Sequence, residues 1–217
     1  MIAIPKIMNL EPNNHSMIEI LDEPSKFFSF YNRPVKNIIP SKEITILEVY
    51  QLIKSNRYQR QTEALRAMTD KKAAQAYKAE QFDYITPSGT FTKRNANSLI
   101  LHSNLMVLDF DDLDDVLGLK KALIVDEYFE PDLLFVSPSS NGLKLVTTID
   151  LEVGSHLDWF MAIAEYTRTT YHLGIDPSGK DVCRCCFLPF DEDVFINPIY
   201  LTSSFTQSFN LNSHENN

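Results

Sequence analysis

The sequence predicts an α+β fold in which an antiparallel sheet is covered by helices on one face. Predicted strands are followed along the chain by predicted helices, an order typical of α+β folds and not of a doubly wound parallel sheet. In addition, the apolar runs Asp132–Val136 and Leu143–Ile149 are joined by a short turn that ends in Asn-Gly. Such a turn between two apolar runs predicts a β-hairpin.

The chain is long enough to bury one sizeable hydrophobic core. It has 217 residues, of which 44% are hydrophobic, and no internal repeat is visible. We therefore expect a single domain over residues 1–204. Residues 205–217 are rich in Ser, Asn and Gln, and we expect them to form a disordered tail.

The first half of the chain is expected to contain one strand and two helices before its first turn motif. Aromatic enrichment predicts a strand over Lys26–Tyr31, and Asn32–Pro34 is typical of a turn. Apolar residues near helical spacing predict a helix over Ser41–Ser55, with Thr45 as a cap. The segment Arg60–Glu80 is rich in Ala, Gln, Lys and Glu, which indicates a second helix on the surface.

The remaining elements are expected to surround the hairpin. The Pro-Ser-Gly sequence within Thr86–Phe91 is typical of a turn. We expect strands at Leu99–Leu101, Leu105–Leu108 and Cys183–Leu188. We expect helices at Leu117–Val125 and at Ser155–Tyr171, the latter capped at its end by Gly174.

Two carboxylates follow the apolar strand predicted at Leu105–Leu108. Side chains alternate along a strand, so Asp109 and Asp111 face the same side while Phe110 points into the core. Carboxylates at this spacing repel and raise each other's pKa unless a cation lies between them. The pattern therefore favours a divalent cation, and hard oxygen ligands suit Mg²⁺ or Mn²⁺.

The same acidic stretch allows a second interpretation. Asp112, Asp114 and Asp115 would serve equally well as a solvated loop or as caps of a helix that starts near Leu113. An Asp-x-Asp pair also occurs in glycosyltransferases, nucleases and calcium loops. An EF-hand is disfavoured because the loop lacks the central Gly and the closing Glu.

Two further polar loops carry residues that complement these carboxylates. The turn after the first hairpin strand supplies hydroxyls and backbone N–H groups, and Lys144 adds a positive charge; the turn residues are Ser139, Ser140, Asn141 and Gly142. A later loop adds Asp176 together with Lys180 and Arg184. Carboxylates that hold two cations, beside basic groups that hold phosphate oxygens, suit a metal-bound triphosphate.

Charge and cysteine content restrict the class of protein. The net charge of −9 argues against coating of duplex DNA by charge alone. A local basic strip nevertheless runs from Arg57 to Arg94, and its alternative interpretation is a solvated helix face. Cys183, Cys185 and Cys186 are too crowded for a disulfide framework and lack His partners for zinc, so we expect reduced, partly buried thiols.

No targeting or membrane signal is recognisable in the sequence. Neither a signal peptide nor a run of about 18 apolar residues appears. We therefore expect a cytoplasmic protein that does not enter a membrane.

The order of three segments resembles the motifs of the archaeo-eukaryotic primase (primase-polymerase) superfamily. These segments are Leu108–Asp111, Ser137–Lys144 and Ile175–Arg184. More closely, the sequence resembles the VirE N-terminal domain family, in which three further segments recur: Phe27–Phe28, Thr86–Phe91 and Asp191–Pro198. The resemblance extends from about Lys26 to Pro198.

This resemblance implies an RRM-like sheet at about residues 101–200 beside a smaller N-terminal α/β unit at about residues 20–100. It implies that Asp109, Asp111 and Asp176 hold two metal ions, and it matches Arg184 to a basic residue after the third acid. The sequence departs from the superfamily in two places. Lys144 replaces a His that contacts phosphates, and Phe187 replaces a second basic residue.

The function expected from the resemblance is metal-dependent nucleotidyl transfer onto nucleic acid, by a domain of a bacterial mobile-element or replication protein. Its expected partners are a nucleoside triphosphate, a single-stranded DNA or RNA template, and a helicase-like domain or protein, since no P-loop motif occurs here. One alternative is a catalytically degenerate domain that binds nucleic acid or a partner through the basic strip. Another is a metal-dependent nuclease that uses the same carboxylates.

Overall fold

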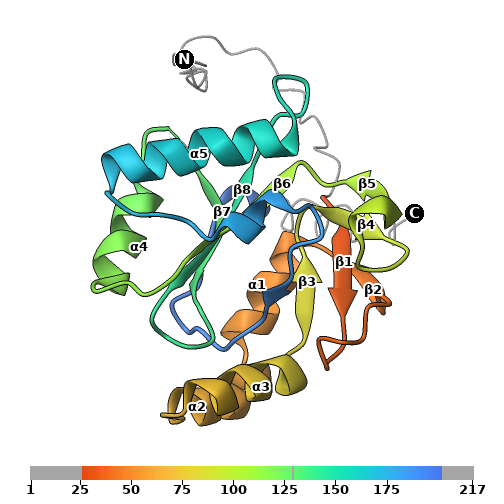
Figure 1. Cartoon of the computed structure of the whole chain (residues 1–217), viewed down its shortest axis with the longest axis vertical. Helices are drawn as coiled ribbons and strands as arrows, with labels where there is room; N and C mark the ends of the chain where they lie inside the picture. Colours follow the sequence, from red (N-terminus) through yellow and green to blue (C-terminus); the bar gives the residue numbers. More distant parts are fainter. Residues whose placement is uncertain (1–25, 129, 202–217) are drawn as a thin grey trace, which may run out of the picture.

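The computed structural model describes residues 26–128 and 130–201, and in this part of the chain two four-stranded antiparallel sheets share a core (Figure 1). The first sheet has the order β2-β1-β3-β9, with β1 (Phe28–Tyr31), β2 (Lys42–Ile44), β3 (Tyr84–Thr86) and β9 (Cys186–Phe187). The second has the order β10-β7-β8-β6, with β6 (Leu105–Phe110), β7 (Pro131–Val136), β8 (Leu143–Thr148) and β10 (Phe195–Ile196). A separate hairpin pairs β4 (Gly89–Phe91) with β5 (Leu99–His102).

Five α-helices lie within the described residues, and they confirm the predicted α+β class. They are α1 (Ile46–Lys54), α2 (Gln59–Arg66), α3 (Lys71–Gln81), α4 (Val116–Ile124) and α5 (His156–Thr170). Three short 3₁₀ turns accompany them: η1 (Asn56–Tyr58), η2 (Ala96–Ser98) and η3 (Pro177–Lys180). The predicted hairpin is present as β7 and β8, which pair in antiparallel register.

The second sheet is buried on both faces. On β6, Leu105 and Val107 point towards α1 and the first sheet, where they join the core that contains Phe28 and Phe30. Met106, Leu108 and Phe110 point to the other face, which α4 and α5 cover with Leu119, Leu123, Phe160 and Ile163. Strands that are apolar on both faces require cover on both sides, which is why α1 lies between the two sheets.

The predicted helix over Ser41–Ser55 is wrong in its first part. Residues Lys42–Ile44 form β2 and pair with β1, and the helix begins only at Ile46. Thr45 is its N-cap, as predicted, and it forms a capping box with Glu48. Thr45 has an extended backbone, so the helix cannot continue towards the N-terminus beyond it. The residues before Thr45 can therefore pair as a strand.

The predicted helix over Arg60–Glu80 is two helices. α2 ends at Arg66, and Asp70 then caps α3 by accepting a hydrogen bond of 2.7 Å from the Ala73 N–H. The predicted surface character holds for α3, which buries none of its residues. A second N-cap inside an otherwise helical composition is therefore what divides the segment.

Three smaller expectations are also corrected. Thr86–Phe91 is not only a turn, because Gly89–Phe91 pairs with β5, and a Cβ at Gly89 would lie 2.3 Å from the Leu101 carbonyl oxygen. Tyr171, not Gly174, caps the end of α5. The strand expected over Cys183–Leu188 shrinks to Cys186–Phe187. The tail predicted at residues 205–217 lies outside the described residues.

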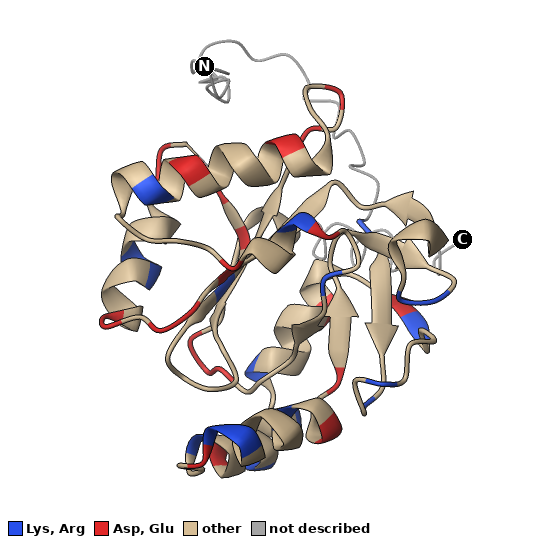
Figure 2. Ribbon diagram, in the orientation of Figure 1, with Lys and Arg blue, Asp and Glu red and all other residues tan. Residues whose placement is uncertain are grey.

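Charge is unevenly distributed between the two halves of the fold (Figure 2). Residues 26–100 contain 13 Lys and Arg and 6 Asp and Glu, whereas residues 101–201 contain 6 Lys and Arg and 18 Asp and Glu. Blue segments accordingly gather on α2 and α3 in Figure 2. Among the described residues, no helix is long and apolar enough to cross a membrane.

Candidate functional site

Asp109 lies at the end of β6, on the face that points towards the first sheet. The residue is 3% exposed, so its carboxylate is almost entirely withdrawn from water. Lys144 pairs with one carboxylate oxygen, and Arg184 donates to the other from Nε at 3.1 Å and from Nη2 at 2.5 Å. A buried carboxylate needs such partners, since an unpaired charge in this position is costly.

Strand register and the order of the sheets place these two cations. Lys144 stands directly opposite Asp109 in the β6–β8 pairing, so both side chains emerge on the same face. Arg184 comes from the loop before β9, the edge strand of the first sheet. The Asp109 centre, by which we mean Asp109, Lys144, Arg184 and Asp176, therefore lies where the two sheets meet.

Asp176 reaches the centre from the loop that leads into η3. Its N–H donates to the Asp109 carbonyl oxygen at 3.0 Å, and its carboxylate accepts from Arg184 Nη2 at 2.7 Å. The same carboxylate caps the turn by accepting from the Ser178 N–H at 2.9 Å. The turn packs closely, because a Cβ at Gly179 would lie 2.9 Å from the Phe160 ring.

Asp111 and the hairpin turn occupy the rim above this centre. Asp111 is exposed, and a Cβ at Gly142 would lie 2.3 Å from the Phe110 carbonyl oxygen. Asn141 donates to Asp112 at 3.0 Å from its side chain, which holds the turn against the end of β6. Only glycine allows that close approach of the two loops.

The remaining predicted residues lie at the surface of the same region. Ser139 and Ser140 are exposed in the hairpin turn, and Lys180 is exposed at the end of η3. These three side chains make no hydrogen bond or ion pair with other described residues. They face solvent, whereas Lys144 and Arg184 are committed to carboxylates.

Lys78 is a functional candidate that the sequence placed only in the general basic strip. It lies on α3, with its ammonium 5.9 Å from the centroid of the Phe187 ring. Its electrostatic neighbours are Lys144, Asp111, Asp109 and Arg184, so it faces the Asp109 centre from the first half of the chain. No spacing rule within a surface helix would have distinguished it from Lys71 or Lys72.

Burial and neighbouring charge together shift the pKa values at the centre. Burial acts to raise the pKa of Asp176, but the Ser178 N–H and Arg184 outweigh it, so that pKa lies below its usual value. Burial acts to lower the pKa of Lys144, and the Asp109 carboxylate outweighs it and raises that pKa. For Lys78, burial and then the Lys144 charge lower the pKa.

The carboxylates are not arranged as a ready-made cation site in this structure. Among the described residues, no three His, Cys, Asp or Glu side chains converge as metal ligands. Asp111 and Asp176 keep oxygens accessible to solvent, whereas both oxygens of Asp109 are taken by Lys144 and Arg184. A divalent cation would fit Asp109 only after one of these two side chains turned away from it.

The three cysteines are free thiols next to the centre. Cys183 and Cys185 are partly buried, as the sequence predicts, whereas Cys186 is fully buried. Burial raises the pKa of Cys185 to about 12. Burial therefore favours the protonated form of this thiol over the thiolate.

One family model matches the chain. It is described as BT4734-like, N-terminal domain, and it matches residues 76–195, which is more than half of the sequence and includes every residue of the Asp109 centre as well as Lys78. No curated protein and no solved structure matches the chain. The expected membership of the VirE N-terminal domain family, and with it of the primase-polymerase superfamily, is wrong, because the family that matches is a different one. The chain belongs to the family of BT4734-like N-terminal domains.

Proposed function

We propose that the Asp109 centre binds a nucleoside triphosphate together with Mg²⁺ or Mn²⁺ and transfers its nucleotidyl group onto a nucleic-acid end. The terminal hydroxyl of the nucleic acid bonds to the α-phosphorus, the bond from that phosphorus to the β-phosphate breaks, and pyrophosphate leaves. The observation that supports this proposal is the meeting of three cations and three carboxylates at the junction of the two sheets. The cations are Lys78, Lys144 and Arg184, and the carboxylates are Asp109, Asp111 and Asp176. Structural packing needs ion pairs, but it does not need six charges of both signs beside an exposed rim.

The chemistry asked of such a centre is mainly positioning and charge neutralisation. Arg184 presents a planar guanidinium that suits bidentate contact with phosphate oxygens. Lys144 and Lys78 add compact positive charges, and Lys78 is free to contact a ligand because it makes no hydrogen bond or ion pair with the described residues. Nucleotidyl transfer requires little else from the protein, since the reaction depends on aligned phosphates and neutralised charge.

Asp111 and Asp176 are the residues best placed to hold the cation, and Asp109 would join them if Lys144 or Arg184 turned to the phosphates. When bound, the cation would supply further charge neutralisation at the phosphates. Such an exchange would leave the Asp109 charge compensated, because Asp109 would lose one basic partner only as it gained the cation. The proposed partners therefore include a divalent cation, a nucleoside triphosphate and a nucleic-acid strand.

The first test is calorimetric titration of a nucleoside triphosphate in the presence and absence of Mn²⁺. Asp111→Asn is the informative variant because the side chain is exposed, and Asp114→Asn in the same acidic loop is the matched control. We expect affinity to depend on Mn²⁺ and to fall at least about tenfold in Asp111→Asn only. Equal affinity in both variants, or affinity that ignores Mn²⁺, contradicts the proposed cation site.

A labelled primer with a template then tests transfer itself. Lengthening of the labelled strand supports nucleotidyl transfer, and its shortening supports the nuclease alternative instead. The reaction should require Mn²⁺ or Mg²⁺ and should be lost in Asp111→Asn. A strand of unchanged length under conditions in which the triphosphate binds excludes transfer.

A second candidate function is binding of phosphate groups without transfer. The observation that favours it is the complete pairing of Asp109 with Lys144 and Arg184, which compensates the carboxylate with no metal ion. In that case the triphosphate would bind through Lys78, and binding would persist in EDTA. The calorimetric titration separates the two functions, because only the first depends on the divalent cation.

A further inference from the structure

A polar cavity lies between η1 and the segment that follows β1, and it is built around Asp83. Its volume is about 430 Å³, and it is lined by Asn32, Arg33, Arg57, Tyr58, Gln61 and Asp83, which we call the Asp83 pocket. Small-molecule sites commonly have volumes of about 300–1,000 Å³. The pocket thus has room for a phosphate group together with an attached nucleoside.

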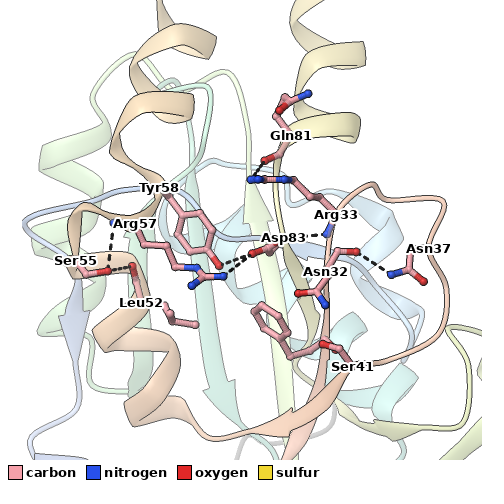
Figure 3. Close-up of polar contacts among 11 residues, drawn as sticks. Asn32, Arg33, Asn37, Ser41, Leu52, Ser55, Arg57, Tyr58, Gln81 and Asp83 are labelled. Carbon is pink, nitrogen blue, oxygen red and sulfur yellow. Dashed lines mark hydrogen bonds and ion pairs between the residues drawn. The ribbon is translucent and has the colours of Figure 1, made fainter.

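Asp83 holds the wall of this pocket in place. Its side chain is 6% exposed, and it accepts hydrogen bonds from the Arg33 N–H at 2.9 Å and from the Tyr58 hydroxyl at 3.0 Å. Arg57 lies 3.5 Å from the same carboxylate. Figure 3 shows Tyr58 and Arg57 reaching Asp83 from one side and the Arg33 backbone from the other. The carboxylate is therefore an internal anchor, with its oxygens already occupied.

Both arginines are held in position, but only Arg57 is paired with a carboxylate, at 3.5 Å from Asp83. Arg33 binds Asp83 only through its backbone N–H, and its guanidinium donates to the Gln81 carbonyl oxygen at 3.3 Å. The Arg57 side chain is 54% exposed, and its guanidinium lies 5.6 Å from the centroid of the Tyr58 ring. Two arginines and one carboxylate line the pocket, so it has a surplus of positive charge and N–H donors that the carboxylate does not use.

Phosphate is the ligand chemistry that fits this surplus. Guanidinium groups match phosphate oxygens in geometry and charge, and side chains already held in place lose less entropy on binding. Asn32 and Gln61 add amide donors and acceptors, which suit the polar edge of a nucleobase. A phosphate with an attached nucleoside thus satisfies both kinds of lining group.

The charges around the pocket favour a single-stranded nucleic acid as the ligand over a single small anion. Gln61 belongs to α2, which also carries Arg60 and Arg66, and α3 follows with Lys71 and Lys72. Figure 2 shows blue segments on these two helices, with red segments among them. The basic side chains of this segment suit the repeated phosphates of a single-stranded nucleic acid.

We propose that the Asp83 pocket binds one nucleotide of a single-stranded nucleic acid, with its phosphate on Arg33 and Arg57. The proposal shares with the proposed function only the premise that the domain acts on nucleic acid. It does not depend on a metal ion or on transfer at the Asp109 centre. A nucleic-acid strand bound in this pocket would lie along residues 26–100, the positively charged half of the domain.

The test is fluorescence anisotropy of a labelled single-stranded oligonucleotide in EDTA, at several salt concentrations. The informative variant is Arg33→Gln/Arg57→Gln, and the matched control is Lys121→Gln/Arg168→Gln, which removes the same charge from exposed positions on α4 and α5. We expect the pocket variant to bind at least about tenfold more weakly, with a salt slope reduced by about 1, and the control to bind as the wild type does. Equal loss in both variants, or no loss in the pocket variant, overturns the proposal.

Further measurements separate the possible sources of phosphate and the two sites. A nucleoside monophosphate is titrated beside the oligonucleotide, and the proposal requires the oligonucleotide to bind more tightly. A monophosphate that binds as tightly shows that the pocket takes free nucleotides and overturns the assignment to a strand. Thermal unfolding of the pocket variant must match that of the wild type, since both arginine side chains are exposed.

The Asp111→Asn variant completes the design because it tests the other site. It should retain oligonucleotide binding in EDTA even where metal-dependent triphosphate binding is lost. Loss of oligonucleotide binding in Asp111→Asn with full binding in the pocket variant would assign the strand to the Asp109 centre and overturn the proposal. The proposal for the Asp83 pocket is therefore tested by oligonucleotide binding in EDTA, and the proposal for the Asp109 centre by metal-dependent triphosphate binding.

Discussion

The Asp109 centre and the Asp83 pocket both place a buried carboxylate beside arginine, but they differ in how fully the cations are used. At Asp109, Lys144 and Arg184 occupy both oxygens, and Arg184 is shared with Asp176. At Asp83, backbone and hydroxyl donors provide the close contacts, and the arginine side chains face solvent. A site with balanced charge suits exchange of partners with a cation and phosphates, whereas a site with surplus charge suits direct binding of an anion.

The largest expected effect on stability is that of Asp109→Asn. The change leaves Lys144, whose side chain is 10% exposed, without its charge partner. Removing one member of a buried pair costs about 3 kcal/mol of unfolding free energy. Urea unfolding at pH 7 measures this loss, and Asp111→Asn should leave the midpoint unchanged. A wild-type midpoint in Asp109→Asn would show that Lys144 does not depend on this partner.

The next largest effect is a loss of stability in acid, and it comes from the histidine pair that contacts the η3 turn next to the Asp109 centre. His102 Nε2 lies 3.2 Å from His156 Nδ1, and His156 Nε2 lies 3.1 Å from the Gly179 carbonyl oxygen. The Asn104 N–H donates to His102 Nδ1 at 3.0 Å, so the pair is satisfied when both rings are neutral. Burial, and then the His156 charge, lower the pKa of His102 to about 4, and burial lowers the pKa of His156.

The sign of this effect follows from the lowered pKa values. In the unfolded chain a histidine is protonated near pH 6.5, whereas His102 in the folded protein is protonated only near pH 4. The contribution of this residue to stability is therefore complete above pH 6.5 and is lost as pH falls towards 4. His102 is only half-buried, and solvent screening limits the loss to about 2 kcal/mol. Urea midpoints at pH 7 and pH 5 measure it, and His102→Gln should show a smaller difference. An equal difference in that variant would assign the acid sensitivity to other groups.

A smaller loss is expected for Asp83→Asn. The amide oxygen can still accept from the Arg33 N–H or the Tyr58 hydroxyl, and Arg57 is solvated when its partner is lost. We expect a cost of about 1 kcal/mol in urea unfolding. A loss as large as that of Asp109→Asn would mean that the two carboxylates are equally structural, and the comparison drawn above would fail.

The smallest expected change in stability is that of Lys78→Gln. This lysine makes no ion pair or hydrogen bond with the described residues, and burial already lowers its pKa, so its removal should leave the urea midpoint unchanged. Affinity for the triphosphate should nevertheless fall about tenfold, because a positive charge that faces the Asp109 centre is lost. Lys72→Gln on the same helix is the control. Equal triphosphate affinity in the two variants would remove Lys78 from the site.

The elements that the sequence predicted correctly are those whose signals are local. Thr45 caps a helix, Asn141-Gly142 closes a hairpin, and the apolar run at Leu105 is a buried strand. Most of the errors arose where strand pairing decides the local structure. Residues Lys42–Ile44 are a strand because they pair with β1, the preceding strand, and Cys186–Phe187 is the short part of its segment that pairs with the distant β3.

The sequence by itself determined which charged residues were candidates for the Asp109 centre, because Asp109 ends an apolar run that must be buried and the others lie in or beside polar loops. Only the tertiary structure decided that Asp109 is paired with Lys144 and Arg184, that Lys78 faces the same centre, and that Arg33 and Arg57 share a pocket with Asp83. The physical reason is that ion pairs and cavities depend on the packing of two sheets, and each of these sheets includes a late strand from beyond residue 185. Local spacing specifies strands and caps, but it does not specify which distant side chains meet.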